Sequence, residues 1–204
     1  MDAFTESVTL LLVLLNPFML SVYLHDMLRT LEPKTIRWIL LRSSSTSILV
    51  FSAFALTGDA FFRDFLQVRF ASFLIFGGSI FLIIGIQFVI LGHHAKERLV
   101  GGTPEHIAGS ITMPFMIGPG TVSASVVAGT RSPAWVAILA IVVAVACTAI
   151  GVLLLDALQR RVSKHYEGFV ERYTEVVGRI SALIIGTVAI DMILRGIDLW
   201  RPSE

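Results

Sequence analysis

The sequence predicts an all-α membrane protein in which six transmembrane helices form a 3+3 repeat of inverted topology and helices one and four are broken. Three observations lead to this class. Of the 204 residues, 55% are hydrophobic, against about 45–50% in soluble domains, and the mean hydropathy is +0.80. The charged residues, 15% of the chain, stand between long uncharged runs. Two proline-containing motifs also occur at corresponding positions of the two halves.

Six apolar segments are long enough to cross a bilayer as helices, which takes about 20 residues each. They cover 4–28, 36–58, 70–91, 107–130, 134–155 and 180–199. The second contains Arg37 and Arg42, which must extend to the headgroups. Its serine-rich stretch at 43–47 either lines a polar path or packs at helix contacts. We expect a single transmembrane domain over 1–204, with repeat one at 1–92, an inner loop at 93–106 and repeat two at 107–204.

The distribution of positive charge predicts the orientation in the membrane. The loops after spans one, three and five, with the adjoining span ends, hold 11 of the 16 Lys and Arg residues, and such loops stay in the cytoplasm. We therefore expect a multi-pass protein of the cell (inner) membrane with both termini on the non-cytoplasmic side. The acidic start of the chain favours a retained first span over a cleaved signal peptide. The charged and aromatic stretch at 159–177 is predicted to lie on the inner surface as a short helix.

Composition and motifs argue against several functions. A net charge of +1, without basic runs interleaved with aromatics, argues against binding of nucleic acid. Cys147 is the single cysteine, so no intrachain disulfide or cysteine-based metal site is possible. The sequence holds neither an HExxH motif nor a nucleotide-binding Gly-x-x-x-x-Gly-Lys loop. We expect no enzyme activity, no metal and no cofactor, so that any transport draws on an ion gradient.

An internal repeat relates the two halves of the chain. Pro17 and Pro119 lie 102 positions apart, and the segment 86–92 resembles 190–196 at an offset of 104. Similar offsets at both ends indicate a duplicated unit of three helices. Because three is an odd number of crossings, the second unit runs through the membrane upside down relative to the first, as in transporters built from inverted repeats.

The two motifs predict broken helices near the middle of the membrane. A proline inside a helix removes a backbone hydrogen bond and breaks or kinks the helix. Asn16 suits a helix N-cap and Pro17 the first helical position, and Gly118 and Pro119 repeat this order before Gly120. Counting about 1.5 Å per residue puts the breaks roughly 15 Å and 18 Å deep. Lipid cannot satisfy the freed backbone groups, so the breaks must be buried in protein or line a watery cavity.

These breaks predict a site for a small anion, most simply a carboxylate. Two helix N-termini, each with unpaired amide groups and a partly positive dipole end, would face the centre of the bundle. The alternative is that the prolines only kink tightly packed helices. The hydroxyl groups of Thr121, Ser123 and Ser125 either add to the site or bond to the backbone of their own helix. The predicted substrate-binding residues are Asn16, Pro17, Gly118, Pro119, Gly120, Thr121 and Ser123.

Asp191 is the candidate for proton coupling. It lies within span six, where charged groups usually face partners or cavities. Arg195 follows one turn later on the same helix face, so the alternative is a structural ion pair. Gln87 occupies the corresponding position of span three.

These residues resemble the MarC-type family of small integral membrane proteins, also described as the small neutral amino-acid transporter family. The resemblance rests on Asn16-Pro17 in the first span and on Met-Pro-Phe-Met-Ile-Gly-Pro-Gly-Thr at 113–121 in the fourth. The segments 69–71 and 196–197 extend it over essentially the whole chain. The chain departs from the family pattern in two ways. The acidic residue and the glutamine of spans three and six are exchanged, and Met19 replaces a glycine that often follows the first break.

The resemblance implies six spans, a 3+3 inverted repeat, both termini outside, and proton-linked transport of glycine, alanine and similar neutral amino acids. Together with the predicted site, it leads us to expect a secondary transporter in the lipid bilayer, coupled to protons or sodium. Two alternatives stay open: an exporter of amino acids or other small metabolites, and a non-transporting membrane assembly subunit. The sequence also leaves open whether the chain forms an oligomer.

Overall fold

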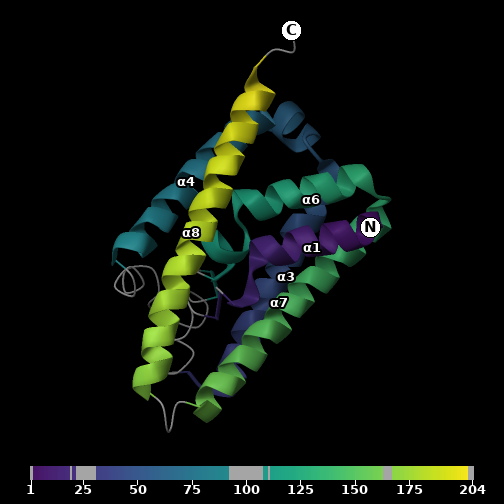
Figure 1. Cartoon of the computed structure of the whole chain (residues 1–204). Coiled ribbons are helices and arrows are strands. Elements are labelled where there is room, and N and C mark those ends of the chain that lie inside the picture. Colours follow the sequence, from purple (N-terminus) through teal and green to yellow (C-terminus); the bar gives the residue numbers. More distant parts are fainter. Residues whose placement is uncertain are drawn as a thin grey trace.

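The computed structural model describes residues 2–18, 20–21, 31–91, 108–109, 111–162 and 167–201, and these residues contain helices and connections but no strand. Figure 1 shows the arrangement: α4 and α8 lie together along one side of the molecule, and α1, α3, α6 and α7 form the rest. The elements in chain order are α1 (Ala3–Leu15), α3 (Pro33–Thr57), η1 (Phe61–Phe65), α4 (Phe70–Leu91), η3 (Ile111–Met116), α6 (Pro119–Arg131), α7 (Ala134–Val162) and α8 (Glu167–Trp200).

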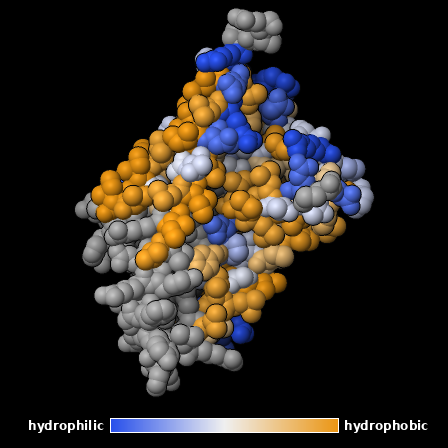
Figure 2. All heavy atoms as spheres, viewed as in Figure 1, coloured by the Kyte–Doolittle hydropathy of each residue, from blue (hydrophilic) through white to orange (hydrophobic). Residues whose placement is uncertain are grey.

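Three helices are long and apolar enough to cross a membrane. They are Pro33–Thr57 of α3, Phe70–Gln87 of α4 and Ala134–Leu158 of α7. α1 is apolar but has 13 residues, which is too short for a full crossing on its own. A chain with these helices is an integral membrane protein. Figure 2 accordingly shows hydrophobic side chains over much of the surface, with the hydrophilic ones gathered near the ends of helices.

Small residues let α4 and α8 pack closely as an antiparallel pair. A Cβ added at Gly196 would lie 2.9 Å from the carbonyl oxygen of Ala71, and one added at Gly78 would lie 2.8 Å from that of Ala189. The next contact of this series joins Gly85 and Ala182. Within each helix these positions recur every seven residues, which keeps them on one face. Close backbone approach through small residues is a general way to hold membrane helices together.

The core of the second group lies between α1, α3, α6 and α7. Apolar side chains such as Leu11, Ile39, Phe51, Met116 and Ile141 are almost completely buried in it. α3 and α6 come closest at Gly129, where a Cβ would overlap the carbonyl oxygen of Ala55. This core holds both helix breaks, because α1 ends in it and α6 begins in it.

Several expectations from the sequence need correction. The stretch at 159–177 is not a separate surface helix: α7 runs on to Val162, and α8 is continuous from Glu167 to Trp200. Charge alone therefore did not end either helix. A short π-helical segment, η1, precedes α4 and was not predicted. The predicted inner loop at 93–106, and residues 22–28 of the first span, lie outside the described residues.

Candidate functional site

Asn16 forms the first break. α1 ends at Leu15, and Asn16 takes the left-handed backbone conformation (φ 38°, ψ 82°), which asparagine tolerates better than most residues. Its amide N–H donates to the carbonyl oxygen of Leu12 (2.9 Å), and its own carbonyl accepts the N–H of Leu20 (3.0 Å). Asn16 thus caps the C-terminus of α1 and also the start of the next helical segment, which Pro17 opens as predicted.

Thr121 holds the second break together. Gly118 has extended backbone angles and caps α6, and Pro119 is the first helical residue. The Gly118 N–H donates to Thr121 Oγ1 (2.9 Å), and the Thr121 hydroxyl in turn lies 2.8 Å from the carbonyl oxygen of Met116. The side chain of Thr121 is 3% exposed. Its hydroxyl is therefore already used inside the break, and what remains for a ligand is its backbone.

Two buried amide groups at the start of α6 have no hydrogen-bond partner among the residues that the structure describes. The first amides of a helix have no partner within it; here Pro119 has no N–H and the Gly118 N–H is bound by Thr121. The amide N–H groups of Gly120 and Thr121 have no hydrogen-bond partner among the described residues. Both residues are buried. A buried N–H without a partner is rare and costly, so these two donors are suited to an oxygen atom of a ligand.

The end of α1 lies beside this start of α6. A Cβ added at Gly120 would lie 3.6 Å from the Leu14 Cδ2 atom. At their other ends, Arg131 of α6 forms an ion pair with Glu6 of α1 (2.9 Å). The two helices therefore run side by side in opposite directions, as Figure 1 shows. Both breaks therefore lie in the same buried region of the bundle.

Each break proline packs on a glycine of another helix. A Cβ at Gly151 of α7 would lie 2.9 Å from Pro17 Cβ, and a Cβ at Gly77 of α4 would overlap Pro119. A Cβ at Gly118 would overlap the ring of Phe81, whereas one at Gly120 would make ordinary contact, with 3.4 Å to Met192 Sδ. The close approach that requires glycine is therefore at Gly118, and Gly120 has more room than the sequence suggested.

An apolar cavity of about 410 Å³ adjoins the second break. Its wall includes Gly118, Pro119, Phe81 and Ile80, together with side chains of α3. Phe81 lines this cavity and also lies close to Gly118 and Gly120. The lining of the cavity therefore suits an apolar side chain of a ligand better than a polar one.

The remaining predicted residues take other positions. Ser123 is half-buried in α6, and Ser125 is buried and donates to the carbonyl oxygen of Thr121 (2.7 Å), the helix-internal bond that was its alternative reading. Asp191 does not reach the breaks: it lies on the outward face of α8 and pairs with Arg195 at 2.7 Å. Gln87 is also exposed.

Several buried polar groups could not be recognised from the sequence. Asp156, which directly follows the predicted span at 134–155, is only 9% exposed and lies on the buried face of α7 that also carries Thr148 and Val152. In the sequence, the interval of four residues between Thr148, Val152 and Asp156 was the signal that puts Asp156 on the same helix face as two buried residues. In the serine-rich stretch, Ser43 donates to the carbonyl oxygen of Ala108 (3.0 Å), which favours the reading of helix contacts. The hydroxyls of Ser21, Ser44 and Ser47 are buried without a hydrogen-bond partner in the described part of the chain.

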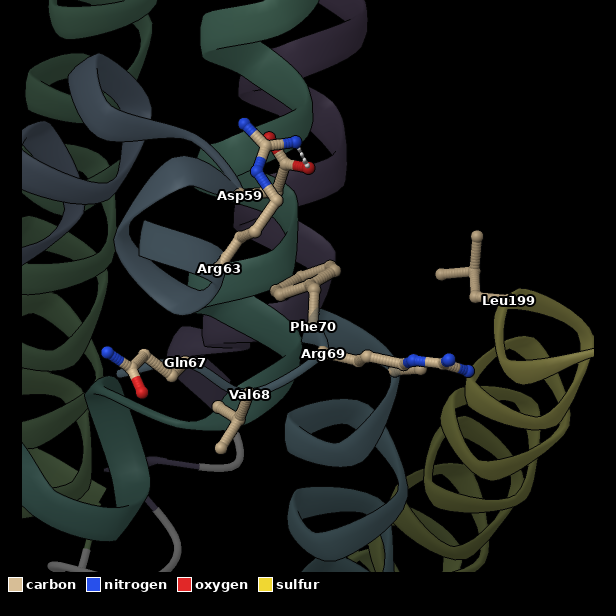
Figure 3. A pocket seen from close by; sticks show the side chains of 8 residues that line it. Asp59, Arg63, Gln67, Val68, Arg69, Phe70 and Leu199 are labelled. Atoms are coloured by element: carbon tan, nitrogen blue, oxygen red, sulfur yellow. Dashed lines mark ion pairs between the residues drawn. The ribbon is translucent and has the colours of Figure 1, made fainter. Parts of the chain in front are cut away.

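A polar hollow of about 390 Å³ lies at the end of the bundle where α4 begins (Figure 3). Arg63 forms ion pairs with Asp59 (3.6 Å) and Asp64 (3.1 Å), and the hydrogen bond to Asp64 raises the pKa of Arg63. Arg69 points toward α8, where it donates to the carbonyl oxygen of Trp200 (3.3 Å) and lies over its ring. Because both arginines already have partners, we assign them to holding the helix ends.

Comparisons with known proteins agree with an integral membrane protein. The sequence model described as "MarC family integral membrane protein" matches residues 1–200. The chain is similar to the UPF0056 inner membrane protein YhgN of Escherichia coli (strain K12), with 23% identity over 203 residues and coverage of 100% of both chains. The protein of the same name from Shigella flexneri matches to the same extent. No solved structure matches the chain.

Proposed function

The chain belongs to the MarC family of integral membrane proteins, and we propose that it is a secondary transporter of small neutral amino acids such as glycine or alanine. The observation that carries the proposal is the pair of free, buried amides at Gly120 and Thr121. They lie at the N-terminus of a helix that begins inside the bundle, where the helix dipole adds positive potential. A substrate carboxylate supplies the oxygen atoms that such donors bind.

The described side chains around Gly120 favour a neutral amino acid as substrate. The described residues nearest to Gly120 from other elements are Leu14, Phe81 and Met192, all apolar. A charged substrate side chain would lose its hydration here without gaining a partner. The first break adds a second helix start at Pro17, whose dipole end supports binding of the same carboxylate.

We further propose that the six spans form a 3+3 inverted repeat with both termini on the non-cytoplasmic side. Two helix contacts support the repeat, because α1, the half before the first break, packs on α7 as η3, the half before the second break, packs on α3. The α4 and α8 pair gives independent support. An offset of 104 residues relates Gly78 to Ala182 and Gly85 to Ala189. The contact between Gly78 and Ala189 is therefore repeated by the contact between Gly85 and Ala182, with the two helices exchanged. Inverted repeats provide two equivalent arrangements, one open to each side of the membrane.

Uptake by the purified protein in liposomes tests this function. The expected result is accumulation of labelled glycine or alanine when a proton or sodium gradient is imposed, with loss of the accumulation when an ionophore removes that gradient. Liposomes without protein, and liposomes with the Gly120→Val variant, are the controls. Exchange without accumulation would indicate a carrier whose direction follows the substrate gradient, as in an exporter. No movement of any neutral amino acid in either direction would contradict the proposal and favour an assembly subunit.

A further inference from the structure

A polar stripe crosses the outward face of α8. It consists of Thr187, Asp191 and Arg195, which follow one another at intervals of four residues and so lie along one line of the helix. The side chains of Asp191 and Arg195 are 56% and 71% exposed, although they pair with each other. The stripe is flanked by exposed aliphatic side chains, namely Leu183, Ile190 and Leu194. Figure 2 shows the hydrophilic patch on the C-terminal half of α8 between hydrophobic surfaces.

The stripe lies at the depth of the lipid chains. Ala189 packs against Gly78 of α4, a helix apolar enough to span the membrane. Trp200, held by Arg69, marks the polar end of α8. Asp191 lies about 13 Å from Trp200 along the helix axis, which is most of the depth of one leaflet of a core about 30 Å thick. Charged side chains at such depth face protein or a watery cavity rather than lipid.

We propose that a second copy of this chain covers the stripe, so that the protein forms a homodimer through α8. The charge pattern selects this partner. Around a two-fold axis normal to the membrane, each surface meets its own copy. Equivalent residues then meet at the same depth, so the Asp191–Arg195 pair of one copy lies beside the same pair of the second copy. Each Arg195 is one helical turn from Asp191 of the second copy, and its long side chain can extend to it. Four charges are thereby removed from lipid in one interface, and no other kind of partner is needed to balance them.

A groove beside the stripe provides room for the second copy. Its volume is about 480 Å³, and its floor is formed by Gly85 and Gly186 where α4 and α8 meet. A Cβ added at Gly186 would meet no atom within 4 Å, so a side chain of the second copy has space to enter. Thr187 and Ile190 of the same helix line this groove, which makes it continuous with the stripe. Small residues at this place allow the close approach that membrane helices need to associate.

Disulfide crosslinking in native membranes tests the contact directly. Cys147 is the single cysteine, so its replacement by Ser gives a background free of other thiols. In this background Thr187→Cys is expected to form a crosslinked dimer on oxidation. The matched control is Leu154→Cys on α7, which is equally exposed toward lipid but lies far from the stripe in sequence and on another helix. It is expected to stay monomeric under the same conditions.

Charge reversal in trans tests the specificity of the interface. Chains with Asp191→Arg alone, or with Arg195→Asp alone, are expected to lose dimerisation about tenfold or more at equal density in lipid, since each homodimer opposes like charges. Co-expression of the two variants is expected to restore dimers, now mixed, because opposite charges face each other again. Fluorescence energy transfer between labelled copies in liposomes gives the readout.

A variant that preserves the charges tests whether loss of the dimer in the charge-reversal variants is caused by misfolding. Gly186→Trp fills the groove. A Cβ at Gly186 would meet no atom within 4 Å, and the adjoining groove of about 480 Å³ can take the ring, so this variant is expected to remain folded and to lose the dimer. The proposal is overturned if the wild-type chain stays monomeric at every density, or if neither the reversals nor Gly186→Trp reduces its dimer fraction. The readout is oligomeric state, so the result does not depend on whether the chain transports amino acids.

Discussion

At the scale of single residues, the two helix breaks are stabilised in different ways. Asn16 accepts an unusual backbone conformation and serves as the end of one helix and the cap of the next. Gly118 instead adopts extended angles, and the Thr121 hydroxyl bridges the gap by hydrogen bonds on both sides. The second break therefore depends on one hydroxyl group, whereas the first depends on backbone geometry.

Replacement of Thr121 by Val should destabilise the second break. Val has nearly the same shape but leaves the Gly118 N–H and the Met116 carbonyl without this partner, which costs about 1–3 kcal/mol for buried groups. Thr121→Ser keeps the hydroxyl and should stay close to the wild type. Thermal unfolding of both variants in detergent measures the difference. Equal stability of Thr121→Val and the wild type would show that the hydroxyl does not hold the break.

The Gly120→Val variant should lose substrate binding and remain folded. A Cβ at Gly120 makes only ordinary contact, but a β-branched side chain limits access to the two free amides. Binding is measured by calorimetry with glycine or alanine. Gly109→Val, where a Cβ would meet no atom within 4 Å, is the control and should bind normally. Gly118→Val is a poorer test because it displaces Phe81. Normal binding by Gly120→Val would remove the amides from the site.

Asp191→Asn tests the coupling candidate. If Asp191 carries the proton, this variant should still bind substrate but should no longer accumulate it against a gradient, because an amide keeps the hydrogen bonds and cannot titrate. The ion pair with Arg195 supports the structural alternative. That alternative expects the combined variant with Arg195→Gln to accumulate substrate as the wild type does, since no unpaired charge is left. Proton-driven uptake by the double variant at the wild-type rate would exclude a coupling role.

At the scale of helices, local patterns predicted the breaks and the three helices that can cross a membrane, but not their surroundings. Pro17 and Pro119 could be recognised because a proline disrupts a helix wherever it stands. The overlap that makes glycine necessary at Gly118 depends on Phe81, 37 positions earlier in the chain, and no local pattern contains it. The span predicted at 134–155 ends just before Asp156, but α7 continues beyond this residue to Val162.

Gly129→Ala should weaken the contact between α3 and α6. Its Cβ would overlap the Ala55 carbonyl oxygen, a backbone atom that cannot rotate away. Overpacking of this kind costs about 1–3 kcal/mol or more. The matched control is Gly186→Ala, where the added Cβ meets no atom within 4 Å. Thermal unfolding should show a clear loss for Gly129→Ala alone, and equal stability of the two variants would mean that the helices separate at little cost.

At the scale of the whole molecule, the chain divides into a rigid pair and a group that contains the breaks. The α4 and α8 pair is held by close backbone contacts along its length. The core of α1, α3, α6 and α7 instead contains amides and hydroxyls that bond to no other residue in the described part of the chain. Polar groups that lack partners within the protein are suited to water or a ligand. We expect the movements of a transport cycle to occur where the first group meets the second, at Gly118 and Phe81.

Accessibility of the two breaks to water tests the central claim most directly. In the background without Cys147, cysteines are placed at Ser21, after the first break, and at Ser123, after the second. Membrane-impermeant thiol reagents are added to either side of sealed vesicles. The account predicts that both cysteines react in at least one condition, preferentially from opposite sides, and that glycine or alanine slows both reactions. If both cysteines stay unreactive in every condition, with and without substrate, the breaks do not line a transport pathway.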